Sequence, residues 1–97
     1  MRPTKKQITY LSHLIFESEA EDAKRFMSEL PNDFYFAAHR LKKIDLRGDY
    51  RRFCFEERLL EKTDITEMSH LISLVQSYNF KRLEEVLKNR GIKIKEE

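Results

Sequence analysis

A stripe of apolar residues after Asp64 most constrains what this chain can fold into. Its members recur every three or four positions, which places them on one face of a helix with 3.6 residues per turn. Asp64 and Glu67 stand at the spacing of a capping box, in which two side chains bond N–H groups that the first helical turn leaves unpaired. The segment therefore predicts an amphipathic helix that begins after Asp64. The stripe consists of Ile65, Met68, Leu71, Ile72 and Val75.

Two further capping boxes near the start of the sequence predict two more helices. Thr4 and Gln7 form the first box, and the helix that follows is expected to run to about Phe16. Ser18 and Glu21 form the second box, and the proline at position 31 closes that helix because proline disfavours helical geometry at the residue before it.

Asparagine and glycine mark the ends of the next and the last helix. Asn32 is a candidate N-cap for a third helix, which Gly48 interrupts. Asn79 can cap the final helix, and Gly91 is placed to end it in a left-handed C-cap conformation. Residues 92–97 are then expected to form a frayed tail.

The segment 49–61 leaves two structures open. Its apolar spacing fits a helix, whereas Phe53, Cys54 and Phe55 in succession also fit a short strand. We favour the helix.

These elements together predict an all-α fold, a small single-domain bundle of five to six short helices over residues 1–97. A chain of 97 residues has room for one modest hydrophobic core and not for two. Only two glycines and two prolines are present, which argues against a sheet with many tight turns. The short loops make successive helices neighbours in space.

No motif for catalysis or for metal binding can be recognised. His13, His39 and His70 lie far apart, and none belongs to a two-ligand helical spacing or to a Cys/His pair. Cys54 is the only cysteine, and its aromatic neighbours favour a buried core residue over a reactive thiol. We therefore expect no catalytic residues, no metal and no cofactor, and keep a small hydrolase or transferase as a minor alternative.

The cysteine content and the hydropathy also bear on location. A single cysteine permits no internal disulfide, which fits a reducing compartment. No apolar run reaches the roughly 18 residues that a membrane span needs. We expect a cytoplasmic protein that has no membrane contact.

The segment from His39 to Arg52 is the leading candidate for a binding site. It holds six Lys and Arg against two Asp, with the aromatic residue Tyr50 among the charges and Phe53 directly after them. Guanidinium groups and aromatic rings can together contact phosphates and bases, or dock on an acidic protein surface. A solvated helix face is the alternative reading of such a cluster. The candidate residues are Tyr35, Phe36, Arg40, Lys43, Arg47, Tyr50, Arg51 and Arg52.

The charge balance favours a protein partner over nucleic acid. The formal net charge is only +2, and an acidic patch of Glu17, Glu19, Glu21 and Asp22 would repel phosphates. We therefore expect a non-enzymatic modulator of a protein, with direct DNA or RNA binding as the alternative. A homodimer also stays open, because an amphipathic helix that lacks partners within the chain can pair with a second copy.

Two stretches resemble a short helical pattern of phage and mobile-element proteins associated with DNA recombination or replication. The run from Pro3 to Leu14 contains T-K-x-Q-I-x-Y-L-x-x-L, and residues 67–72 are similar to the E-x-S-x-L-I that accompanies it. About fifty residues separate the two stretches here, and the pairing is usually closer. The resemblance implies a phage-type protein that works near DNA metabolism, as an accessory or inhibitor of a host nuclease or helicase.

Overall fold

The computed structural model describes residues 1–30, 50–92 and 94, and within them the chain forms five helices and no strand. The all-α prediction is therefore confirmed. The helix expected after Asn32, and the glycine expected to end it, lie outside the described residues.

The first helix, α1 (Lys5–Phe16), begins where the capping box predicts. The Gln7 N–H donates to Thr4 Oγ1 at 3.1 Å, and the Thr4 N–H donates to Gln7 Oε1 at 3.0 Å. The face turned to the core carries three apolar side chains and one hydroxyl. These buried residues are Ile8, Leu11, Ser12 and Ile15.

The second helix, α2 (Glu21–Ser28), lacks the predicted cap. Its N-cap residue is Ala20, which makes no side-chain capping bond. The Ser18 hydroxyl instead accepts the Ala20 N–H at 3.1 Å, so the serine closes a local turn ahead of the helix. The expected Ser18–Glu21 capping box is wrong for this reason. The C-cap at Glu29 confirms that the helix closes before the proline.

The segment whose structure the sequence left open is helix α4 (Tyr50–Lys62). Cys54, Phe55 and Leu59 are its buried side chains, which confirms Cys54 as a core residue. Just after the helix, the buried Thr63 hydroxyl donates to the Leu59 carbonyl at 2.6 Å.

The last two helices, α5 (Ile65–Gln76) and α6 (Phe80–Asn89), form a hairpin. The predicted capping box begins α5, because the Glu67 N–H donates to Asp64 Oδ1 at 2.8 Å and the Asp64 N–H donates to Glu67 Oε1 at 3.0 Å. Asn79 caps α6 as expected and accepts the Arg82 N–H at 3.3 Å.

Both helices of the hairpin end in the same backbone motif with different residues at its strained position. The N–H groups of Tyr78 and Asn79 donate to the carbonyls of Val75 and Leu74 after α5, and Gly91 and Ile92 repeat this pattern after α6. This is the Schellman arrangement, which needs a left-handed residue. Gly91 has φ 79° as predicted, whereas Tyr78 has φ 58° without glycine's freedom.

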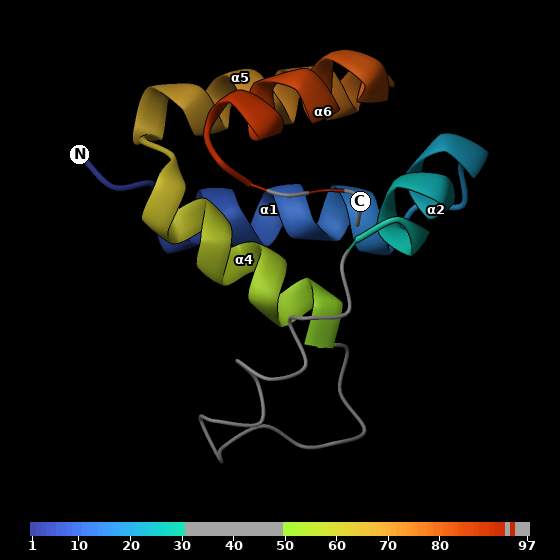
Figure 1. The fold of residues 1–97 in the computed structure, drawn as a ribbon, viewed down its shortest axis with the longest axis horizontal. Helices are drawn as coiled ribbons and strands as arrows, with labels where there is room; N and C mark the ends of the chain where they lie inside the picture. The colour runs from blue at the N-terminus through green and yellow to red at the C-terminus, as the bar shows by residue number, and fades with distance from the viewer. Residues whose placement is uncertain (31–49, 93, 95–97) are drawn as a thin grey trace.

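Helix α1 lies at the centre of the molecule, where it packs against α2, α4 and α5 (Figure 1). The α5–α6 hairpin covers one side of α1, and α4 lies on the other side. Residues from every described helix meet in one core. Its fully buried large side chains are Leu11, Ile15, Phe26, Phe55, Leu59, Met68, Leu71, Leu83, Leu87 and Ile92.

The predicted frayed tail is wrong at the two positions after Gly91 that the structure describes. Ile92 is completely buried and Ile94 is 6% exposed, and both belong to the core. The Ile92 N–H is also bonded to the Leu87 carbonyl at 2.9 Å, which turns the chain back toward α1 (Figure 1). Burial of two isoleucines offsets the entropy of ordering this stretch.

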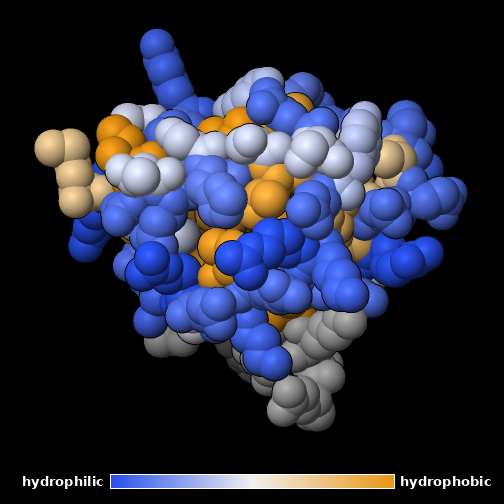
Figure 2. Space-filling view, turned by 90° about the horizontal axis from the view of Figure 1, so that it is seen from above, coloured by the Kyte–Doolittle hydropathy of each residue, from blue (hydrophilic) through white to orange (hydrophobic). Residues whose placement is uncertain are grey.

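The surface seen from the side of α5 and α6 is mainly hydrophilic, and apolar atoms show only in small areas between polar side chains (Figure 2). This face therefore presents no large apolar patch of the kind that marks an obligate interface.

Candidate functional site

Most of the binding residues expected from the sequence fall outside the described part of the chain. Tyr50 and Arg51 lie in the first turn of α4, where the backbone alone is described. Arg52 is the one candidate whose side chain the structure places. The candidates outside the described residues are Tyr35, Phe36, Arg40, Lys43 and Arg47.

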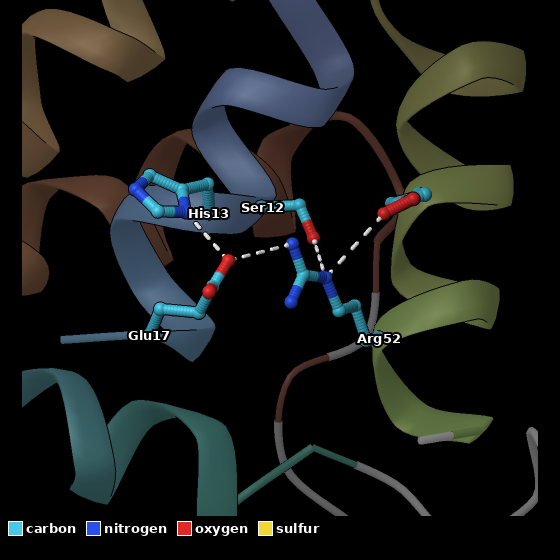
Figure 3. Close-up of polar contacts among 5 residues, drawn as sticks. Ser12, His13, Glu17 and Arg52 are labelled. Atoms are coloured by element: carbon cyan, nitrogen blue, oxygen red, sulfur yellow. Dashed lines mark hydrogen bonds and ion pairs between the residues drawn. The ribbon is translucent and has the colours of Figure 1, made fainter. Parts of the chain in front are cut away.

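Arg52 joins α4 to the C-terminal half of α1 (Figure 3). Its Nε donates to the Ser12 hydroxyl at 3.0 Å, and its Nη2 lies 3.2 Å from Glu17 Oε2. Glu56, one turn further along α4, lies 3.7 Å from Nε. The planar guanidinium suits this arrangement because its donors point in fixed directions toward several acceptors.

The same side chain also stacks near an aromatic ring. The Arg52 guanidinium carbon lies 5.8 Å from the centroid of the Phe16 ring, within the range of a cation–π contact. Only 29% of the side chain is exposed. Arg52 therefore has a structural role between two helices, and part of its charge is balanced within the chain.

Glu17 stands between the His13 imidazole and the Arg52 guanidinium at the end of α1. His13 Nδ1 lies 2.5 Å from Glu17 Oε2, the oxygen that also faces Arg52. The hydrogen bond from His13, followed by that from Arg52, lowers the pKa of Glu17 below its ordinary value. The acidic patch and the basic segment expected from the sequence thus meet at this carboxylate.

An open hollow of about 710 Å³ runs along the solvent side of α1 beside these residues. We call it the α1 hollow. Among the described residues that line it, Glu17 supplies the one carboxylate, whereas three are Lys or Arg and one is histidine. The lining residues are Lys5, Lys6, Thr9, Tyr10, His13, Glu17 and Arg52.

The outer part of the α1 hollow combines free cations with an exposed aromatic ring. Lys5 and Lys6 are exposed and have no ion-pair partner among the residues that the structure describes. Tyr10 is 45% exposed, and its hydroxyl accepts a hydrogen bond from Gln76 Nε2 at 3.1 Å. That bond fixes the ring between α1 and α5 while one side of it stays open to solvent.

A second hollow of about 340 Å³ lies between α2 and the start of α6. Asp22, Glu29 and Glu84 line it together with Arg25 and Lys81, so its charges are mixed. The α1 hollow has the more uniform charge, and electrostatic complementarity gives it the clearer preference for a class of partner.

The α1 hollow was not predicted from the sequence. Of its lining residues, Arg52 alone is among the expected binding residues. The helical spacing of positions 6, 10, 13 and 17 was a signal that could have placed these side chains on one outer face.

The two stretches that resemble the phage pattern are packed against each other. Gln7 Nε2 on α1 donates to Ser69 Oγ at 3.2 Å and to the Ile65 carbonyl at 3.1 Å on α5. Residues separated by 62 positions therefore meet at one helix pair. This contact gives Gln7 and Ser69 a role in packing.

The described residues contain no group of three or more His, Cys, Asp or Glu side chains arranged to hold a metal ion. No helix among them combines the length and the apolar character required to cross a bilayer.

Comparison of this chain with models of protein families, with curated proteins and with solved structures finds no match.

Proposed function

We propose that this chain is a non-enzymatic binding module that modulates a protein partner. The α1 hollow is the observation that supports the proposal most directly. It combines lysines that have no ion-pair partner within residues 1–30 and 50–92 with a half-exposed tyrosine that a hydrogen bond holds in place. Aromatic and cationic side chains of this kind are frequent among the residues that dominate binding energy at protein interfaces.

A protein partner is favoured over nucleic acid by acidic groups on α1 and α2. The Glu17 carboxylate lines the hollow, and Glu21 and Asp22 stand in the first turn of helix α2. A polyphosphate backbone would be repelled by these groups, whereas a folded protein can present its charges at chosen positions.

The experiment is capture of partners by the immobilised chain from a host lysate treated with nuclease, followed by mass spectrometry. We expect one protein at a fixed ratio to the chain. Leu71→Asp, which places a charge in the core, is the control because a specific partner must be lost when the fold is lost. The proposal would be contradicted if the parent chain captured no protein beyond those that the Leu71→Asp variant also captures.

The setting we propose is DNA processing, where a phage-type modulator would act on a host recombination nuclease or helicase. The resemblance of residues 3–14 and 67–72 to phage proteins supports this setting. The test is degradation and unwinding of linear duplex DNA in a host lysate with added chain. Inhibition that increases with the amount of chain is expected, and unchanged rates at saturation would contradict it.

Direct binding of nucleic acid is the second candidate, favoured by Lys5 and Lys6 beside the exposed ring of Tyr10. Lysines can follow a phosphate backbone while bases stack on an aromatic ring. Affinity would then fall steeply with salt because counterions are released on binding. Failure of both duplex and single-stranded DNA to bind at about 50 mM salt, where phosphate contacts are strong, would exclude it.

A further inference from the structure

We infer that the α1 hollow receives an acidic segment of the partner protein. In the free chain Glu17 is paired with Arg52 at the inner end of the hollow, and a carboxylate of the partner replaces Glu17 there on binding. This inference rests on the proposed protein-binding function and adds the chemistry of the partner. It also assigns Glu17 a role as an internal competitor.

Charge complementarity selects the acidic segment. Lys5 and Lys6 project from the first turn of α1 without an ion-pair partner among the described residues. Arg52 and His13 stand at the other end of the same hollow. A segment with spaced carboxylates can therefore meet cations along its whole length, and such matching sets both the approach and the register of a partner.

The present contacts of Glu17 show how a carboxylate binds at the inner end. One oxygen of Glu17 faces both His13 Nδ1 at 2.5 Å and Arg52 Nη2 at 3.2 Å (Figure 3). The Glu17 side chain is nevertheless 51% exposed. A carboxylate from another molecule can thus reach the same two donors from solvent.

Glu17 can leave without disturbing the fold around it. It is the C-cap residue of α1, so its side chain lies past the last helical residue. When Glu17 turns away, Arg52 remains fixed by Ser12 and Glu56. The guanidinium therefore stays pre-organised for an incoming carboxylate, which limits the entropy lost on binding.

Tyr10 supplies the apolar part of the contact. Tyr10 stands between the lysines and His13 in the sequence of α1, its side chain lines the hollow, and its hydroxyl is bonded to Gln76. A rigid ring gives contact area with little loss of side-chain freedom. The segment that fits best carries apolar residues between its acidic ones.

Opposite charge changes in the hollow therefore have opposite expected effects. Glu17→Gln removes the competing charge, and we expect affinity for an acidic segment to rise about two- to fivefold, the range of one exposed ion pair. Lys5→Glu with Lys6→Glu reverses two charges, and we expect affinity to fall by at least about tenfold. Both changes suit the helix dipole, and loss of the exposed Glu17 ion pair lowers stability too little to prevent folding.

The measurement is fluorescence anisotropy of a labelled peptide of alternating Glu and Leu, titrated with the intact chain. Lys88→Glu on α6 is the matched control, because Lys88 is an exposed lysine that is not among the residues lining the α1 hollow. Circular dichroism melts verify that each variant is folded. The inference is supported if affinity for the peptide rises with Glu17→Gln, falls with the double lysine variant and is unchanged by Lys88→Glu.

Any of three outcomes would overturn the inference. In the first, the parent chain does not bind the peptide; in the second, it binds oligothymidylate more tightly than the peptide; in the third, the Glu17→Gln variant binds the peptide no better than the parent chain does. The lysate experiment separates this failure from failure of the proposed function. A partner captured equally by the parent chain and by the double lysine variant keeps the protein-binding function and removes the α1 hollow as its site.

Discussion

Arg52 Nε donates a hydrogen bond at 3.0 Å to the hydroxyl of Ser12, a residue that is completely buried on α1. A polar atom in the core normally lowers stability unless it is bonded, so the two side chains depend on each other. Their bond also fixes the start of α4 against the middle of α1.

Ser12→Ala and Arg52→Lys are each expected to cost about 1 kcal/mol in the free energy of unfolding, the usual worth of one hydrogen bond. Lysine lacks the planar fork that reaches several acceptors at once. Urea denaturation measures both costs. The double variant should cost less than the sum because both changes break one bond, and strictly additive costs would contradict this dependence.

Tyr78→Asn is expected to raise stability by about 1 kcal/mol, because asparagine tolerates the left-handed conformation that tyrosine holds there at φ 58°. Little packing is lost, since Tyr78 is 64% exposed. The measurement is the thermal midpoint, which should rise by about 4–8 °C per kcal/mol in a domain of this size. Tyr10→Asn is the comparison at an exposed tyrosine within a helix, where no gain is expected.

Gly91→Ala tests the same conformation from the other direction. Apart from its two chain neighbours, no described residue has an atom within 4 Å of an added Cβ, so the expected cost comes from the backbone at φ 79°. We expect a loss of about 1 kcal/mol, the usual penalty for a left-handed residue with a Cβ. An unchanged urea midpoint would show that the α6 end relaxes to another turn.

Asp64 makes the free energy of unfolding depend on pH in the acidic range. Its hydrogen bond from the Glu67 N–H, followed by that from the Thr66 N–H, holds the pKa of Asp64 below its ordinary value. A group whose pKa is lower in the folded state stabilises the fold above its unfolded pKa, about 3.9 for Asp, and this contribution is lost as pH falls through the folded pKa.

Asp64→Asn is therefore expected to flatten the loss of stability between about pH 5 and pH 2, the range in which an Asp of lowered pKa titrates. Asparagine keeps a side-chain oxygen for the N-cap, so the helix start is retained. Urea midpoints across this range provide the measurement. Glu17 contributes to stability with the same sign, since its pKa is also lowered. If stability falls with pH equally in the parent chain and in Asp64→Asn, Asp64 is not the cause of the loss, and Glu17 is the other group with a lowered pKa.

Ile92→Ala is expected to cost about 3 kcal/mol, because truncation of a fully buried isoleucine leaves a cavity. Lys88→Ala, at an exposed position one turn earlier, is the matched control and should change stability by less than about 0.5 kcal/mol. Chemical denaturation measures both. Equal stability of the two variants would mean that the residues after Gly91 are not part of the core.

The features that the sequence predicted correctly are local ones. Helix caps depend on residues within one or two helical turns, so they can be recognised without the rest of the fold. This holds for the capping boxes at Thr4 and Asp64 and for the caps at Asn79 and Gly91. The capping box predicted at Ser18 was wrong although it is also a local feature. A serine hydroxyl can accept the N–H of the residue two positions ahead, here Ala20, in place of an N–H in the first turn of a helix.

The features that the sequence missed depend on distant contacts. Arg52 and Glu17 are 35 positions apart, and only the packing of α4 on α1 brings them together. Ile92 is buried in a core to which every described helix contributes, and no local pattern reveals this. The α1 hollow was missed because Lys5 and Lys6 form no sequence motif with Arg52.

The burial of Ile92 and Ile94 also has a consequence for how the protein is made. These residues complete a core that includes Leu11 and Ile15, which leave the ribosome more than seventy residues earlier. A nascent chain can form single helices as it emerges, but the interior stays open to water until position 94 is free of the exit tunnel. Slow translation over the last codons of this stretch would therefore prolong the exposure of apolar surface to chaperones and proteases.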